Sequence, residues 1–270
     1  MLAKTIETGP SALLPYEASS RKLLLEWGPQ HLHAVLWNNQ TGSPEAIESF
    51  SGALTDEDAW DTALGQSRLL QLRQVPATLL CAGARLLPVP MEHYQPEASH
   101  LHLQQLHGYA AWQSQRADML PDEHLALAWQ MPDTMMRLLT GHFEQLTQRH
   151  LLGALLAHPL HEPDTTGHLV FTPQHLLCLL HHNGRLQYAG ALPVLQPDDL
   201  AYRLLQLLQA YAISPAATNW RLAGVLQTDS ALWQGLARYI DVLEPWPVAD
   251  AAWAGQQPAH YFAHLFQLMS

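Results

Sequence analysis

Histidine is the residue of this chain whose chemistry is easiest to interpret, because imidazole binds transition metals and transfers protons near neutral pH. The chain has 17 histidines. His31 and His33 alternate along a predicted strand and would share one face, as would His100 and His102 if that segment were extended. A catalytic zinc site needs three converging ligands, and neither H-E-x-x-H nor paired C-x-x-C occurs. The spacing therefore favours a polar-surface role for the histidines and predicts no metal site.

Clustered carboxylates are the second candidate chemistry. Asp56, Glu57 and Asp58 form one cluster, and Asp198 and Asp199 form another. Both clusters lie where helices are predicted to start, and there a negative charge interacts favourably with the helix dipole. No G-x-S-x-G segment occurs to supply an activated serine. The carboxylates are therefore interpreted as structural, and no catalytic residue is predicted.

The charge balance excludes several functions. The formal net charge is −11, and lysine occurs only at Lys4 and Lys22. A P-loop of the form G-x-x-x-x-G-K-[ST] and a Schiff-base lysine in the body of the fold are thus excluded. A nucleic-acid partner is not expected either, because phosphate binding needs clustered Lys and Arg. With 48% hydrophobic residues, the chain can still form a sizeable core.

The two cysteines and the hydropathy pattern indicate a cytoplasmic protein. Cys81 and Cys178 each lie in an apolar run, which is typical of buried strand thiols and not of a disulfide framework. No apolar run reaches the roughly 18 residues that a membrane span requires. The N-terminus lacks the basic and then apolar pattern of a signal peptide.

The first half of the chain is predicted to be a mixed α/β unit. Strands at 22–27, 31–37 and 46–50 are separated by turns and would form an antiparallel meander. The elements predicted after the meander are, in order, a helix from Thr55, a strand at 75–81, an insertion at about 86–119, a strand at 124–129, a helix at 132–142, a strand at 145–150 and a helix at 151–157.

The second half repeats this order after a Pro- and Thr-rich boundary at 158–167. Asn183-Gly184 is a strong hairpin signal inside the second meander. The predicted elements are strands at 168–172, 175–182 and 185–190, a helix from Pro197 to Tyr211, a strand at 219–226, a helix capped by Asp229 and a strand at 240–243. The expected division is a lead-in at 1–20, a first lobe at 21–158, a second lobe at 165–245, and a tail at 246–270 whose helix docks on the body.

The duplicated order resembles the ribonuclease-H-like unit that is repeated in actin and the sugar kinases. More closely, the chain resembles an uncharacterised bacterial family, domain of unknown function 3822, which has an actin-like ATPase fold. The resemblance covers roughly residues 20–245, and the segments that carry it are 22–28, 129–143, 168–190, 198–211 and 221–243. It implies an α/β fold of two lobes, each with a mixed sheet made of a three-stranded meander and strands joined by crossover helices.

The resemblance also implies where a nucleotide would bind. The first phosphate hairpin would contain Glu26, Gly28 and Gln30, but Pro29 between them lacks an amide N–H. Active relatives carry Asp-x-Gly at this position. The second hairpin would contain Thr172 and Gln174, and it has neither the acidic residue nor the glycines that active relatives carry. The adenosine loop would contain Gly224, where two glycines are usual. All three loops thus depart from the pattern of active relatives.

We therefore expect a non-catalytic actin-like protein that acts as an interaction or scaffold module with a protein partner. Trp246 and Trp253 in the tail are the predicted partner contacts. The alternatives are an ATP-binding or ATPase member with atypical loops, which would use ATP and Mg²⁺, and a binder of another small molecule between the lobes. The sequence does not specify the partner, the ligand or the oligomeric state.

Overall fold

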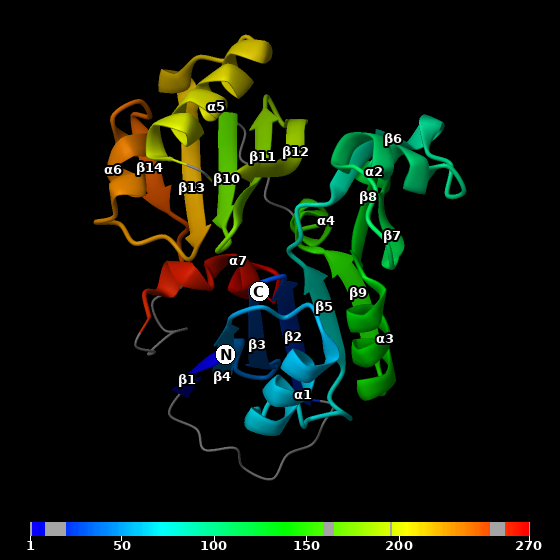
Figure 1. Cartoon of the computed structure of the whole chain (residues 1–270). Coiled ribbons are helices and arrows are strands. Elements are labelled where there is room, and N and C mark those ends of the chain that lie inside the picture. The colour runs from blue at the N-terminus through cyan, green and yellow to red at the C-terminus, as the bar shows by residue number, and fades with distance from the viewer. Residues whose placement is uncertain (1, 9–19, 159–164, 195, 249–256, 270) are drawn as a thin grey trace.

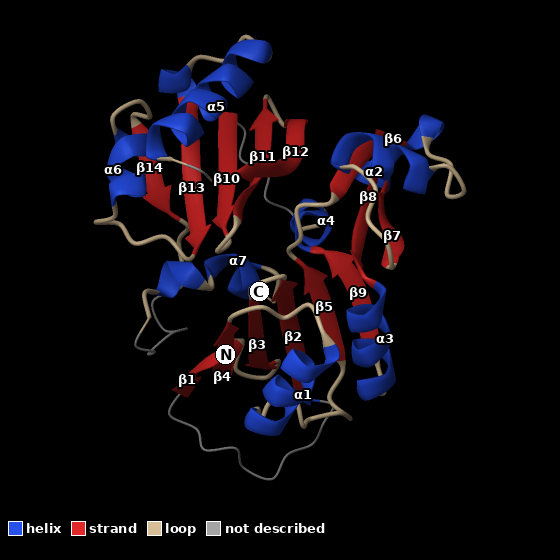
Figure 2. Cartoon of the chain, in the orientation of Figure 1, coloured by secondary structure: helices blue, strands red, loops and turns tan. Residues whose placement is uncertain are grey.

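The chain folds into two lobes joined by helices that lie between them (Figure 1). The structure is a computed structural model that describes all residues except 1, 9–19, 159–164, 195, 249–256 and 270. Two large sheets form the centres of the lobes, and a smaller third sheet lies beside them (Figure 2). None of the helices in these described ranges is long and apolar enough to cross a membrane.

The first lobe is built on a six-stranded sheet of order β1-β4-β3-β2-β5-β9. Strands β2, β3 and β4 form the predicted antiparallel meander, and β5 and β9 run parallel to β2. Strand β1, which the sequence did not predict, pairs with the edge of β4. The bounds are β1 (Ala3–Thr8), β2 (Arg21–Gly28), β3 (His31–Asn38), β4 (Ser43–Ser51), β5 (Ala77–Cys81) and β9 (Leu146–His150).

Helices α1 (Glu57–Gln66) and α3 (Asp133–His142) lie against one face of this sheet, and α4 (Leu151–Leu156) follows β9 (Figure 1). Helix α1 begins where the carboxylate cluster predicted a helix, because Asp56 is its N-cap and accepts the Ala59 N–H at 2.9 Å. With helices on the sheet, β2 and β3 are buried along almost their whole lengths. Their near-continuous apolar sequences reflect that burial.

The third sheet has the order β6-β8-β7 and carries helix α2 (Ser99–His107). Its strands are β6 (Leu86–Pro90), β7 (Gln113–Leu120) and β8 (Leu125–Pro132), with short 3-10 turns at Met91–His93 and Pro121–Glu123. The predicted insertion ended near residue 119, whereas β8 pairs with both β6 and β7. The antiparallel unit therefore extends to Pro132, because two strands cannot bury a face without the third.

The second lobe is built on a five-stranded sheet of order β12-β11-β10-β13-β14. Its bounds are β10 (Thr165–Phe171), β11 (His175–His182), β12 (Arg185–Pro193), α5 (Pro197–Ala210), a 3-10 turn at Pro215–Ala217, β13 (Thr218–Gly224), α6 (Ala231–Ala237) and β14 (Val242–Pro245). The predicted Asn183-Gly184 hairpin is confirmed, with φ of +52° and +71° at its two turn residues. The predicted cap of α6 was wrong by one residue, because Ser230 and not Asp229 accepts the Trp233 N–H.

Both large sheets thus contain a three-stranded meander followed by two strands parallel to its first strand. This duplication confirms the predicted fold class: two ribonuclease-H-like lobes of the actin-like kind, with mixed sheets.

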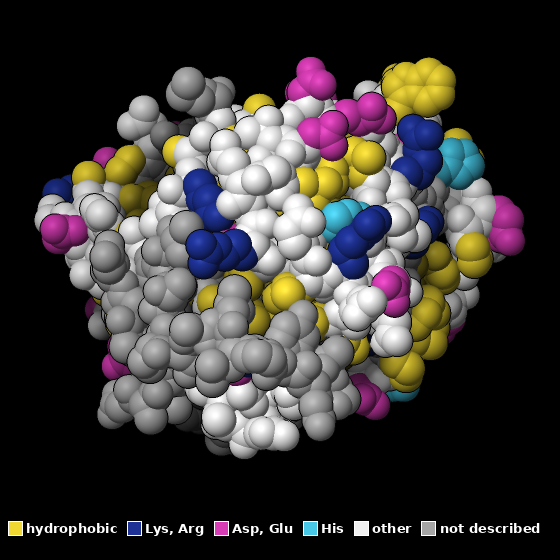
Figure 3. Space-filling model, turned by 90° about the horizontal axis from the view of Figure 1, so that it is seen from below, with side chains coloured by type: hydrophobic (Ala, Val, Ile, Leu, Met, Phe, Trp, Pro, Cys, Tyr) yellow, Lys and Arg dark blue, Asp and Glu magenta, His cyan; other side chains and the backbone are white. Residues whose placement is uncertain are grey.

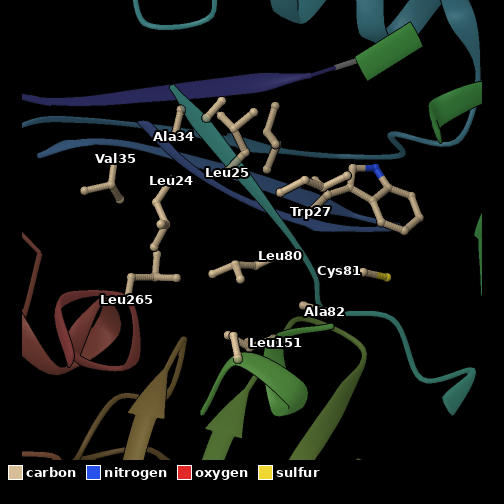
Figure 4. Packing of buried hydrophobic residues seen from close by; sticks show 14 of the residues in the cluster. Leu24, Leu25, Trp27, Ala34, Val35, Leu80, Cys81, Ala82, Leu151 and Leu265 are labelled. Carbon is tan, nitrogen blue, oxygen red and sulfur yellow. The ribbon is translucent and has the colours of Figure 1, made fainter. Parts of the chain in front are cut away.

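One apolar cluster crosses from the first lobe to the second through α4 and α7 (Ala263–Gln267), which follows a 3-10 turn at Ala259–Tyr261. Strand β11 contributes Leu177 and Leu179 to this cluster. Its Leu176, Cys178 and Leu180 point to the opposite face, into a separate core beneath α5 and α6. In Figure 4, Leu265 of α7 lies beside Leu24 of the first sheet.

Candidate functional site

The carboxylate of Glu26 lies at the end of β2, beneath helix α7, and is 2% exposed. One oxygen, Oε1, lies 2.9 Å from Nε2 of His31 on β3. The other, Oε2, lies 2.7 Å from Nε2 of His264 on α7. Glu26 therefore has an imidazole partner on each oxygen, one from its own hairpin and one from the C-terminal helix.

These partners decide the charge of Glu26. Burial by itself raises the pKa of the carboxyl group, but the charge and hydrogen bond of His264, together with those of His31, hold that pKa well below its ordinary value. Glu26 is therefore ionised at neutral pH inside the protein. A buried carboxylate in this state requires positively charged or hydrogen-bonding neighbours, which here are imidazoles.

His33 completes a cluster on the same strand face. Ligand atoms of Glu26, His31 and His33 all lie within 4.8 Å of one another, and all three residues are buried. His33 Nδ1 lies 2.8 Å from Ser49 Oγ, and the ring meets Phe262 edge-on at 5.4 Å between centroids. Burial lowers the pKa of His33 to about 3, so its ring is neutral. Two imidazoles and a carboxylate that converge in this way could hold a metal ion.

Gly28 serves the packing of His31. A Cβ at this position would lie 2.2 Å from Cε1 of His31, so only glycine leaves room for the ring. The neighbouring turn residue Gln30 is exposed, and its backbone carbonyl accepts the Gly52 N–H at 3.0 Å.

In the second predicted phosphate hairpin, the side chain of Thr172 bonds the backbone of the turn. Thr172 Oγ1 donates to the His175 carbonyl at 2.8 Å and accepts the N–H groups of His175 at 3.1 Å and Gln174 at 3.3 Å. The turn amides that would hold a phosphate already have an acceptor, and Pro173 has no N–H to add. The Gln174 side chain is exposed.

Gly224, in the predicted adenosine loop, lies against the backbone of the second lobe. Its φ is +88°, and an added Cβ would lie 2.1 Å from the Phe171 carbonyl oxygen. The next residue, Val225, donates its N–H to that same oxygen at 2.9 Å. The glycine therefore permits β13 to approach β10 closely.

The two hairpins meet at the end of β5. His175 Nε2 donates to the Ala82 carbonyl at 2.8 Å, and the Ala82 N–H donates to Trp27 at 2.8 Å. Burial lowers the pKa of His175 to about 4, so its ring is neutral. This chain of bonds connects the lobes where the nucleotide loops were predicted.

The six predicted site residues, Glu26, Gly28, Gln30, Thr172, Gln174 and Gly224, thus lie at strand ends on both sides of this contact. None of the six lines the cavities of about 620, 350 and 390 Å³ found among the described residues.

Sequence reasoning missed His264, because the tail was interpreted only by its apolar spacing. The prediction that Trp246 is free for a partner was wrong, since it is 5% exposed and stacks on His168 at 4.7 Å. Trp253 lies outside the described residues.

Comparison with known structures identifies the fold. A Bacteroides thetaiotaomicron protein with an actin-like ATPase fold and unknown function superposes with a TM-score of 0.76 at 12% identity, covering 94% of this chain and 97% of that one. The PilM-PilN type IV pilus biogenesis complex superposes with a TM-score of 0.57 at 15% identity, covering 92% of this chain and 97% of that one. The ethanolamine utilization protein EutJ from Carboxydothermus hydrogenoformans superposes with a TM-score of 0.50 at 9% identity, covering 97% of this chain and 91% of that one. At these identities the similarity establishes the fold alone.

No curated protein sequence matches the chain significantly. Residues 11–243 do match the family described as protein of unknown function DUF3822. The match spans both large sheets of the structure apart from β1 and the end of β14. This chain therefore belongs to the DUF3822 family.

Proposed function

We propose that the chain is a non-catalytic, cytoplasmic actin-like protein that acts as an interaction module for a protein partner. In this proposal, residues 21–158 and 165–245 are the two lobes, and helix α7 of the tail at 246–270 closes the site between them. The six residues named above are then the remnant of a nucleotide site that no longer binds nucleotide.

The observation that carries the non-catalytic part is the state of Glu26. This residue occupies the position at which active relatives have the acidic residue that serves the metal-bound water. Both of its carboxylate oxygens contact histidines, and one of these, His264, belongs to the protein's own C-terminal helix. A Mg²⁺ ion that accompanies ATP requires oxygen ligands and usually retains several waters. Imidazoles at hydrogen-bond distance, with 2% exposure of Glu26, are unsuited to such an ion.

The hairpin turns support the same conclusion. The amides of Gln174 and His175 are bonded to Thr172, and Pro29 and Pro173 have no N–H to offer. Phosphate binding at a turn depends on several backbone N–H groups that point at the ligand. These four turn positions therefore offer no free N–H to a phosphate.

The interaction role rests on where apolar surface is exposed. Nine large apolar side chains are exposed among the described residues, and five of them belong to the 86–132 unit. Trp112 is 85% exposed and Tyr109 is 79% exposed. Trp112 also has a φ of +56°, which is strained for a bulky residue, and its carbonyl accepts the Asp133 N–H at 2.8 Å. Strain that presents an indole to solvent is typical of a contact site. The five side chains are Leu101, Leu106, Tyr109, Trp112 and Met119.

Charge indicates the chemistry of the partner. Apart from the buried Asp118, the 86–132 unit has four acidic residues and one arginine. On the face seen in Figure 3, Lys and Arg side chains lie in separate small groups, with Asp and Glu among them. This favours a protein with an apolar surface and basic neighbours over a nucleic acid. The structural neighbour PilM was solved in complex with PilN, which supports a protein partner for this chain.

The non-catalytic part is tested by thermal unfolding in the presence of ATP or ADP, with and without Mg²⁺. A ligand at about 100 times its Kd stabilises a protein by about 2.7 kcal/mol, which is readily measured. We expect no shift at millimolar nucleotide. A magnesium-dependent rise would overturn the proposal and favour the ATP-binding alternative.

The interaction part is tested by in-cell cross-linking in the native host, followed by purification. We expect a cross-linked partner with the unchanged chain and its loss in the double variant Tyr109→Ser/Trp112→Ser. Tyr202→Ser/Tyr239→Ser is the matched control, because those side chains are exposed but lie on the second lobe. Equal cross-linking by the two double variants would contradict a role for the 86–132 unit.

A further inference from the structure

We propose that Glu26, His31 and His33 bind one divalent transition-metal ion of the zinc class, buried beneath helix α7. The inference does not rest on the interaction role, because it concerns what holds the inside of the molecule together. The proposed ligands come from two adjacent strands, and the helix above them contributes a residue that contacts one ligand.

The strand register explains why these three residues converge. Glu26 on β2 and His33 on β3 are direct Cα partners in the antiparallel ladder. Directly paired residues have their side chains on the same face of a sheet. His31 is two positions before His33 and shares that face, since successive residues of a strand alternate. Their ligand atoms lie within 4.8 Å of one another. This placement follows from the register of the two strands.

The donor set selects the class of metal. Two imidazole nitrogens and one carboxylate oxygen suit Zn²⁺ and similar transition ions, whereas Mg²⁺ and Ca²⁺ require oxygen ligands. With zinc–ligand bonds of about 2.0–2.2 Å, the ligand atoms of Glu26 and His31, which now lie 2.9 Å apart, would separate slightly to admit the ion between them. Three protein ligands leave a fourth position for a water molecule or another small ligand.

A second layer of contacts orients two of the proposed ligands. His33 Nδ1 lies 2.8 Å from Ser49 Oγ on β4, which fixes the plane of the ring. Glu26 Oε2 lies 2.7 Å from His264 Nε2, which leaves Oε1 to face His31 and the centre of the cluster. Such outer partners are usual around protein-bound metals, because they fix the orientation of the ligands. Gly28 adds the space that the His31 ring occupies.

The site would connect the tail to the first lobe. A metal bound to Glu26 holds the carboxylate in place, and the same carboxylate bonds His264 near the start of α7. The flanking residues Phe262, Leu265 and Phe266 are buried in the core shared by the lobes. Metal binding is therefore expected to stabilise the docked tail together with the hairpin.

The test is a titration of the full chain, without a histidine tag and after treatment with a chelator, with Zn²⁺ and separately with Co²⁺. We expect one equivalent of each ion to bind, the visible absorption of four-coordinate cobalt, and a rise in Tm with Zn²⁺ but not with Mg²⁺. His33→Gln and Glu26→Gln should each abolish this binding. Ser49→Ala removes an outer partner and should weaken binding about 10- to 100-fold. His102→Gln is the control, because that histidine is exposed and lies on α2.

The inference is overturned if the unchanged chain shows no saturable binding of one equivalent, or if His33→Gln and Glu26→Gln bind as tightly as His102→Gln. Should a ligand variant fail to fold, Ser49→Ala keeps all three ligands and still locates the site: binding as tight as that of the unchanged chain would then overturn the inference. The result is also separable from the proposed function. Failure of zinc binding leaves the nucleotide and cross-linking results as they are, and those results do not depend on zinc.

Discussion

Glu26 and His264 lie 238 positions apart in the sequence, and a hydrogen bond of 2.7 Å joins their buried side chains. This contact holds the C-terminal helix on the first strand of the meander. It also gives the second oxygen of the Glu26 carboxylate a partner, since His31 contacts the first. The same bond thus joins the tail to a residue of the predicted first phosphate hairpin.

Loss of this contact should destabilise the fold strongly. His264→Ala leaves the Glu26 carboxylate buried without one partner, and removing a partner of a buried charge costs about 3–5 kcal/mol. His260→Ala is the comparison: its Nε2 donates to the Leu226 carbonyl at 2.7 Å in a partly buried site, so its loss should cost only about 1 kcal/mol. Urea unfolding measures both. Similar losses for the two variants would show that the charge of Glu26 does not matter.

Gly153 in α4 should not tolerate alanine. A Cβ there would lie 2.1 Å from Asp118 Oδ2, and this side chain is held in place by the His150 N–H at 2.7 Å. Overpacking of this kind costs about 1–3 kcal/mol. Gly65→Ala and Gly141→Ala are the controls, because both are helical and nothing lies within 4 Å of an added Cβ. These two should gain up to about 1 kcal/mol from helix propensity. A stabilised Gly153→Ala variant would refute the packing argument.

Gly224→Ala should destabilise more than a positive φ alone explains. The strain of a non-glycine residue at positive φ costs on the order of 1–2 kcal/mol, and the clash with the Phe171 carbonyl adds to it. Gly42→Ala separates the two terms, because Gly42 has a φ of +63° and nothing lies within 4 Å of its added Cβ. Thermal unfolding of both variants measures the difference. Equal losses would mean that the close approach of β13 to β10 is unimportant.

Asp118 should make the protein less stable at neutral pH than at mildly acidic pH. Burial raises the pKa of its carboxyl group to about 6, above the ordinary value of 3.8. The folded state therefore favours the protonated form, and the stability gained from protonation is lost as pH rises through about 6. Asp118→Asn removes the charge and keeps an acceptor for the His150 N–H. It should gain on the order of 2 kcal/mol at pH 8 and little at pH 4.5. Denaturant titrations at both pH values test this.

The exposed Asp122 is the matched control for this prediction, since Asp122→Asn also removes one carboxylate from the same unit. It should change stability by less than about 0.5 kcal/mol at either pH. If Asp118→Asn shows the same small effect at pH 8, burial does not control the Asp118 carboxyl group.

His150 acts in the opposite direction. Burial lowers the pKa of its ring to about 4, below the ordinary 6.5, so the folded state favours the neutral form. Its stabilisation is complete above pH 6.5 and is lost as pH falls from 6.5 through about 4. The neutral ring accepts the Leu152 N–H at 3.1 Å and donates to the Gly83 carbonyl at 3.0 Å. His150→Asn retains a helix cap without a titrating ring. The free energy of unfolding of this variant should therefore fall less steeply as the pH drops below 6.5. If the pH dependence below 6.5 is the same in the variant and the unchanged chain, other groups cause the loss of stability in acid.

Many of the elements were predictable from local pattern. The meander at β2, β3 and β4 follows from apolar runs separated by turns, and the Asn183-Gly184 hairpin follows from the positive φ that these residues adopt readily. The extent of the third sheet was not predictable, because β8 has the same apolar pattern as a strand of the main sheet. Only its pairing with β6 and β7 distinguishes the two.

The candidate site was predictable only in part. Glu26 and Gly28 were found from their place in the first hairpin, and the alternation of His31 and His33 on one strand was visible. Their convergence with Glu26 depended on the register between β2 and β3, which no local spacing reveals. The metal motifs sought in the sequence have ligands close together on one element, whereas these ligands come from two strands.

The sequence by itself determined the class of the fold, the duplication, and the departure of all three nucleotide loops from the active pattern, because these depend on residues close together in the chain. The tertiary structure set the partners of the side chains in these predicted loops and in the tail. It brought His264 to Glu26, turned Thr172 onto the amides of its own hairpin, and buried Trp246 against His168. Each of these contacts is set by how the lobes and the tail pack, since burial and partner choice for a polar side chain depend on segments distant in sequence.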